Sequence, residues 1–117
     1  MSKILNITTD TLEAQLKAAL ERKVKVILIV GAKWDGASKA THMNGIKWAE
    51  SGEHVVLSAD ADENPALVRK FETRKIPIVA VYDEKGRLVT HTEGSEVSDA
   101  SLAEMLKLKA PKAVVAE

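Results

Sequence analysis

The chain has 117 residues, of which 45% are hydrophobic and 29% charged, so we expect one globular domain over residues 1–117. Lysine plus arginine and aspartate plus glutamate number 17 each, and this balance gives no electrostatic reason to expect nucleic acid or a membrane as a partner. There is no cysteine, which excludes disulfides, thiolate catalysis and cysteine-ligated metals, and no apolar run reaches the ~18 residues of a membrane span.

The first elements alternate between strand and helix. Residues 4–7 form a short predicted strand, and Thr9-Asp10 begins a helix in which Asp10 and Glu13 have the spacing of a capping box. The next strand, 24–30, is a continuous run of branched apolar residues. Such runs are typical of strands that are covered by helices on both faces of a parallel sheet.

A second helix is predicted from Asp35 to Glu50. Aspartate is a strong N-cap residue, and Ser51-Gly52 provides a stop signal. The predicted apolar stripe of this helix comprises Ala40, Met43, Ile46 and Ala49. Gly45 lowers helix propensity by about 1 kcal/mol relative to alanine, so we expect close packing at that position.

The second half of the chain continues the alternation and then ends in a hairpin and a helix. Asn64 is a predicted N-cap, with Pro65 at the first helical position. The predicted elements are a strand 55–59, a helix from 64 to 71, strands 75–82 and 87–92 joined by the turn 83–86, and a helix from Ser98 or Ser101 to 110. Residues 110–117 are expected to be frayed.

The order β-α-β-α-β-α-β-β-α resembles the thioredoxin family over about residues 4–110. Three segments carry the resemblance: Trp34-Asp35-Gly36-Ala37-Ser38, Asn64-Pro65 and Arg74-Lys75-Ile76-Pro77. Asp62, Phe71 and Gly94 also fit the family pattern. The resemblance implies a three-layer α/β/α fold with a five-stranded mixed sheet in the order 1-3-2-4-5, four flanking helices and a cis peptide bond before Pro77.

The departures from the family fall where its chemistry lies. Asp35 and Ser38 stand in place of the two redox cysteines, and Ala37 replaces the proline between them. Ile29 replaces the buried acid, Met43 the proline of the second helix and Gly31 a second tryptophan. Thiol–disulfide exchange requires an attacking thiolate and a resolving thiol. The sequence therefore predicts a chain without redox activity.

The leading hypothesis is a catalytically inert, redox-inactive scaffold, either engineered or computationally designed. Asp35 caps the helix, and Ala37 and Met43 favour helix over the family's chemistry. Aromatic residues make up only 3% of the chain, so the core is aliphatic, as in many designed proteins. We expect a cytoplasmic or synthetic monomer that requires no cofactor, metal or partner.

The main alternative is a natural module that binds extended peptides without redox chemistry. The resemblance implies a groove formed by Trp34, Asp35, Gly36, Ile76, Pro77 and Gly94. Such a groove would use main-chain hydrogen bonds, as in strand addition. Two further patterns are weaker: Asp35, Ser38 and His42 as a hydrolytic set, and Asp60 and Asp62 as a partial calcium loop that Pro65 interrupts.

Overall fold

The computed structural model describes residues 4–108. The strands are β1 (Leu5–Asn6), β2 (Val26–Gly31), β3 (Val55–Asp60), β4 (Ile78–Tyr82) and β5 (Leu88–Glu93), and the helices are α1 (Leu12–Arg22), α2 (Gly36–Glu50), α3 (Pro65–Lys70) and α4 (Asp99–Lys107). The order of elements is the predicted one. The predicted helix end at residue 110 and the predicted frayed segment 110–117 lie outside the described residues.

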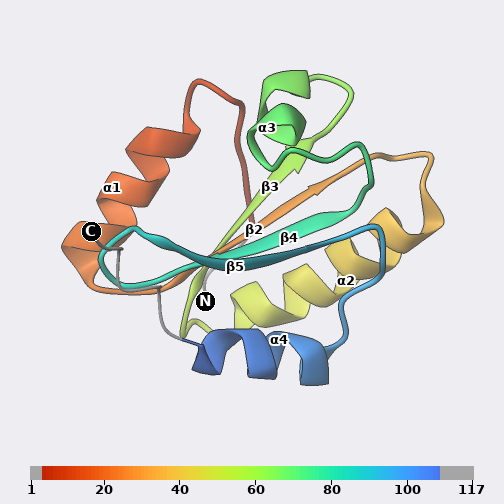
Figure 1. Ribbon diagram of the computed structural model, residues 1–117. Coiled ribbons are helices and arrows are strands. Elements are labelled where there is room, and N and C mark those ends of the chain that lie inside the picture. Colours follow the sequence, from red (N-terminus) through yellow and green to blue (C-terminus); the bar gives the residue numbers. More distant parts are fainter. Residues whose placement is uncertain (1–3, 109–117) are drawn as a thin grey trace, which may run out of the picture.

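The five strands form one mixed sheet in the order β1-β3-β2-β4-β5. Neighbouring strands among β1, β3 and β2 pair in parallel, whereas β4 is antiparallel to both β2 and β5. Helices α1 and α3 cover one face of the sheet, and α2 and α4 cover the other (Figure 1). The three-layer α/β/α architecture and the predicted strand order are confirmed.

The central strand β2 is buried on both faces, as its unbroken apolar sequence predicts. Leu28 packs in the cluster under α1 and α3, and its neighbour Ile29 packs in the cluster under α2 and α4. Both clusters consist mainly of aliphatic side chains. Within residues 4–108, no helix is long and apolar enough to cross a membrane.

One predicted helix start and one predicted side-chain cap differ from the structure. Helix α1 begins at Leu12 rather than near Thr9-Asp10, and the capping box is wrong, because residues 8–11 form a separate turn before the helix. In this turn the Thr11 N–H donates to the Thr8 carbonyl at 3.1 Å, and the Thr11 hydroxyl accepts from the Thr8 N–H at 2.8 Å. Asn64 precedes α3 as predicted, but its side chain does not cap that helix. Its Oδ1 accepts from the Thr9 N–H at 2.8 Å instead, joining α3 to the loop before α1.

Helix α2 has the predicted extent, but part of its predicted stripe is wrong. Met43 is 62% exposed, because the buried face of the helix is made largely of small and polar residues. These buried residues are Ser38, Thr41, Gly45, Trp48 and Ala49. The close packing expected at Gly45 is confirmed, since a Cβ there would lie 2.5 Å from the Cδ1 of Ile29.

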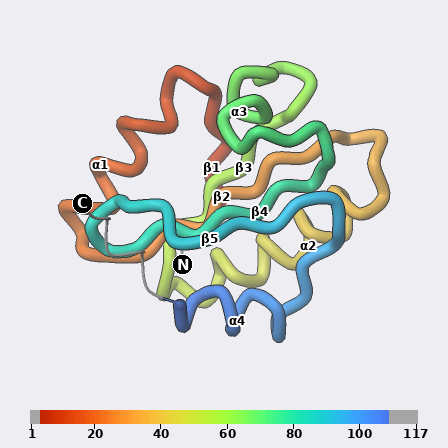
Figure 2. Tube along the Cα trace, in the orientation of Figure 1, coloured from red at the N-terminus to blue at the C-terminus, as the bar shows by residue number. Residues whose placement is uncertain are grey.

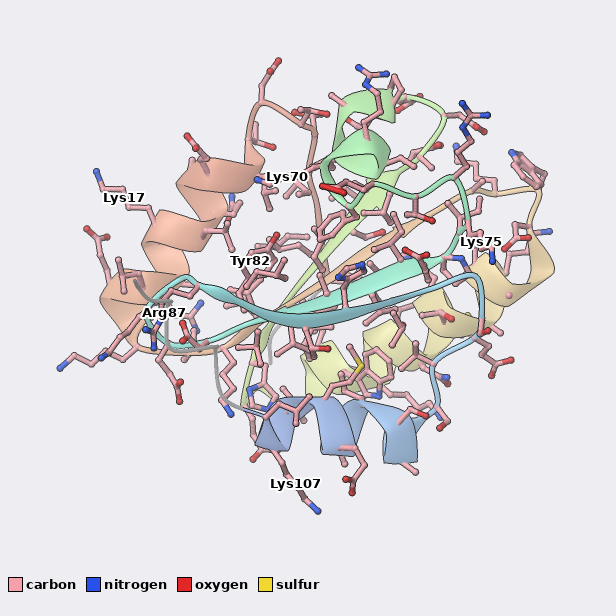
Figure 3. All side chains as sticks on the ribbon, viewed as in Figure 1. Lys17, Lys70, Lys75, Tyr82, Arg87 and Lys107 are labelled. Carbon is pink, nitrogen blue, oxygen red and sulfur yellow. The ribbon has the colours of Figure 1, made fainter. Side chains whose placement is uncertain are left out.

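The single tyrosine of the chain provides a test of this packing. Tyr82 lies under α1 (Figure 3), and its buried hydroxyl has no hydrogen-bond partner among residues 4–108. Burial raises the pKa of Tyr82 to about 12. We therefore expect the absorbance of the folded chain at 295 nm to report phenolate only near pH 12, whereas the chain in concentrated guanidinium should titrate near ~10.

The same shift predicts how stability depends on alkaline pH. The folded-state pKa of Tyr82 is raised, so the stability that the neutral phenol contributes is complete below the unfolded value of ~10 and is lost as pH rises toward about 12. Replacing Tyr82 with phenylalanine should remove this loss. A phenol that ionises near ~10 in the folded chain would show that Tyr82 is not buried as described.

Candidate functional site

Four loops meet at one end of the sheet. Val30 of β2 pairs with Ile78 of antiparallel β4, so the segment after β2 and the segment before β4 leave the sheet at the same end. The parallel pairing of Gly31 with Asp60 brings the segment after β3 to that end as well. Figure 2 shows these connections, and the one from β5 to α4, gathered at that end of the molecule. The element order thus brings together the predicted groove residues.

Trp34 is the most exposed large apolar side chain of this sheet end, with 69% of its surface accessible. Its orientation is fixed by a hydrogen bond from the indole Nε1–H to the Asp62 carboxylate, 2.8 Å long. Because the indole nitrogen is already paired, the ring presents an apolar face to solvent. Asp62 fits the family pattern, but no spacing in the sequence identifies it as the partner of Trp34.

Asp35 and Ser38 form a closed pair at the start of α2. The Asp35 carboxylate accepts from the Ser38 backbone N–H at 2.9 Å and from the Ser38 hydroxyl at 2.8 Å. Ser38 itself is only 4% exposed. The predicted N-cap is confirmed, and both positions that hold sulfur in the resembled family are used here to stabilise the helix.

The cap bonds lead to a stability prediction. Replacing Asp35 with alanine removes both hydrogen bonds to its Oδ2 and should lower the free energy of unfolding by about 0.5–2 kcal/mol. Asp35→Asn is the matched control, because asparagine caps helices about as well as aspartate. It should lower the free energy of unfolding by only a few tenths of a kcal/mol. Guanidinium denaturation of the three proteins measures the difference. Equal losses for both variants would contradict a capping role.

The possible hydrolytic set is not assembled. The Nδ1 of His42 lies 3.4 Å from the Ser58 hydroxyl of β3, and no hydrogen bond joins His42 to Ser38 in the described part of the chain. A nucleophilic serine needs an imidazole base within hydrogen-bond reach and a third group that orients that base. The Ser38 hydroxyl donates its hydrogen bond to Asp35 instead, so the arrangement supports helix capping rather than nucleophilic catalysis.

The acidic loop after β3 forms a hydrogen-bonded turn rather than a metal site. The Asp60 carboxylate accepts from the Asp62 N–H at 2.8 Å, and the Asn64 amide donates to the Asp60 carbonyl at 2.9 Å. Across residues 4–108 there is no group of three or more His, Asp or Glu side chains placed to hold a metal ion.

The segment before β4 leaves backbone groups free at the same sheet end. The peptide bond between Ile76 and Pro77 is cis, and the Pro77 carbonyl accepts from the Gly94 N–H at 3.0 Å. Gly94 has φ +82°, and a Cβ there would lie 3.3 Å from the Lys75 side chain. Within residues 4–108, the N–H and C=O of half-buried Ile76 take part in no hydrogen bond.

The predicted groove residues therefore differ in accessibility. Trp34 and Gly36 are exposed, Asp35 and Ile76 are half-buried, and Pro77 is buried. Gly94 is exposed and stands beside Lys75, whose side chain extends from this end of the molecule in Figure 3. The exposed indole of Trp34 and the Ile76 backbone, which is unpaired within residues 4–108, lie at this same end.

The comparisons with known proteins concern the fold. No protein-family model and no curated protein matches the sequence. Thioredoxin f from spinach chloroplast has a TM-score of 0.77 at 23% identity, covering 90% of this chain and 92% of that one. A mutant thioredoxin from Halobacterium salinarum has a TM-score of 0.75 at 20% identity, and the match covers 90% of this chain and 88% of that one. A poplar thioredoxin h has a TM-score of 0.75 at 19% identity, and the match covers 89% of this chain and 93% of that one. The chain therefore has the thioredoxin fold, without a cysteine.

Proposed function

We propose that this chain is a redox-inactive thioredoxin-fold scaffold without catalytic activity of its own. The observation that carries the proposal is the closed Asp35–Ser38 pair at the start of α2. A carboxylate and a hydroxyl cannot form the mixed disulfide through which thiol–disulfide exchange proceeds. Ser38 is also only 4% exposed, and its hydroxyl has no imidazole partner among the described residues, which does not favour a role as a nucleophile.

The proposal includes a designed origin and a monomeric state. Support comes from the aliphatic core, the side-chain caps that begin α2 and α4, and an aromatic content of 3%. A chain optimised in this way should melt well above the ~45–65 °C typical of mesophilic domains. A scanning-calorimetry midpoint below ~50 °C, or a dimer in light scattering at micromolar concentration, would contradict this part of the proposal.

A second candidate function is the binding of extended peptides at the sheet end. It is favoured by Trp34, which is 69% exposed and held by Asp62, together with the unpaired N–H and C=O of Ile76. An extended peptide could pair with that backbone as an added strand and place an apolar side chain on the indole. Gly94 and Gly36 lack side chains that would obstruct it.

Tryptophan fluorescence distinguishes the two candidates. The Trp48→Phe variant leaves Trp34 as the only tryptophan, so titration with a set of extended octapeptides reports directly on the sheet end. Saturable, sequence-dependent changes that disappear in Asp62→Ala, where Trp34 loses its partner, would establish peptide binding and overturn the inert scaffold. No saturation by any peptide up to millimolar concentration would leave the scaffold function and eliminate the second candidate.

A further inference from the structure

A cavity of about 590 Å³ lies between α2 and the sheet, beside the short edge strand β1. It is separate from the exposed face of Trp34, which does not line it. Strands β1, β2 and β3 contribute Asn6, Ile29, Gly31, Ser58 and Asp60, and α2 contributes Lys39, His42 and Met43. Its volume is within the ~300–1,000 Å³ of typical small-molecule sites.

Strand register and small residues explain why the cavity exists. Ile29 pairs with Ser58 and Gly31 with Asp60, so small or polar side chains follow Ile29 toward the strand ends on the α2 side. Further along α2, the contact between Gly45 and Ile29 closes the helix tightly onto the sheet. Strand β1 extends over only two residues and does not cover the opening. The cavity is thus formed by the backbone arrangement itself.

The lining combines an apolar floor with a positively charged rim. Ile29 is almost fully buried and forms part of the floor, and Met43 adds an exposed apolar side chain at the mouth. Lys33 and Lys39 stand on the rim, and neither forms an ion pair with any residue of the described range. The one rim carboxylate, Asp60, already accepts from the Asp62 N–H.

We propose that this cavity binds a small amphiphilic anion, a carboxylate or sulfonate with a compact apolar body. Two ammonium groups against one carboxylate make the rim net positive, which favours an anionic head group. The apolar body would cover Ile29 and Met43, while the hydroxyl of Ser58 and the imidazole of His42 provide polar contacts within the cavity. This site depends on neither thiol chemistry nor the peptide groove.

The test is a titration of the full chain followed by ¹H–¹⁵N NMR. The probes are 3-phenylpropanoate, octanoate and the neutral 3-phenylpropanamide. Saturable shifts centred on the amides of Gly31, Lys39 and Ser58 are expected, with a dissociation constant of about 1 mM or tighter for the two acids. The neutral amide should bind about threefold or more weakly, since it lacks the charge that the lysines attract.

Substitutions localise the site. Ser58→Leu fills the cavity and should abolish the shifts, and Lys39→Glu should weaken binding of the acids about tenfold while leaving the neutral amide unchanged. Lys17→Glu makes the same charge change on α1, across the sheet, where Lys17 points to solvent (Figure 3), and should have no effect. Met43→Trp, at an exposed helical position, replaces the filling variant should Ser58→Leu fail to fold.

Several results would overturn the proposal. Binding that survives in a folded filling variant would place the ligand elsewhere. Equal weakening by Lys39→Glu and Lys17→Glu would show that the effect depends on the net charge of the protein and not on this site. Absence of saturation with either acid would show that the cavity takes no such ligand. Shifts centred on Trp34 and Ile76 would assign the anion to the exposed surface around those two residues instead and count against this site.

Discussion

The double variant Asp35→Cys/Ser38→Cys is expected to form an intramolecular disulfide and to acquire thiol–disulfide exchange activity. Both side chains already meet across one turn at the start of α2, where the Ser38 hydroxyl lies 2.8 Å from the Asp35 carboxylate. A thiolate at position 35 would lie at the positive end of that helix, which lowers a cysteine pKa and raises its reactivity. The change is from no thiol to a reactive pair, so the effect on activity is the largest that we expect.

The burial of the two positions predicts an asymmetry that the single variants can test. Ser38 is 4% exposed, whereas Asp35 is half-buried at the surface. Asp35→Cys alone should therefore react rapidly with iodoacetamide, and Ser38→Cys alone should react slowly until the chain is unfolded. The double variant should lose both reactive thiols on mild oxidation. If it forms intermolecular disulfides instead, the geometry assigned to this turn is wrong.

Leu28→Ala should lower the free energy of unfolding by about 3–5 kcal/mol. Leu28 is fully buried in the central strand, between neighbours on β3 and β4 that are themselves inaccessible. Removing a buried leucine side chain costs its transfer free energy and also leaves a cavity that the surrounding sheet cannot fill. This loss is a large fraction of the free energy of unfolding of a typical domain, which is ~5–15 kcal/mol.

Leu20→Ala provides the matched control for that measurement. Leu20 lies on α1 and is 42% exposed, so the same truncation should cost less than about 1 kcal/mol. Urea denaturation of the three proteins, with unchanged m-values, gives the comparison. Similar losses for the two variants would mean that β2 is not the buried centre of the sheet.

The strands themselves could be predicted from strong local signals, whereas their order in the sheet was implied by the resemblance to the thioredoxin family. The unbroken apolar run of β2 identifies a strand covered on both faces, and the Asp35 cap marks the start of α2. Helix α1 begins later than predicted because Thr8 and Thr11 close a separate turn through backbone and side-chain hydrogen bonds. No side chain caps the helix, so the capping signals in the sequence do not mark its first residue.

Apolar periodicity also failed at Met43. Prediction from apolar periodicity assumes that a helix buries its largest apolar side chains. Helix α2 instead approaches the sheet through Gly45 and Ser38, where only small residues fit. Its close approach turns Met43 toward solvent. The cavity beside α2 could not be anticipated for the same reason, since it depends on which small residues of β2 and β3 fall opposite each other.

The proximity of Trp34, Ile76 and Gly94 was implied by the family resemblance, and the strand pairing explains it, because it places their loops at one end of the sheet. The hydrogen bond between Trp34 and Asp62 could not, since 28 residues separate them and no spacing rule links them. The hydrogen bond between Asn64 and Thr9 is a similar case. Side-chain pairs of this kind are set by the final approach of loops, which the order of elements leaves open.

The central claim, a thioredoxin fold without redox chemistry, is tested most directly by the reduction of insulin disulfides with dithiothreitol. The unaltered chain is predicted to give the same rate as dithiothreitol alone, because it can form no mixed disulfide with the substrate. The Asp35→Cys/Ser38→Cys variant serves as the positive control on the same backbone and should accelerate the reaction. A concentration-dependent acceleration by the unaltered, cysteine-free chain would contradict the account.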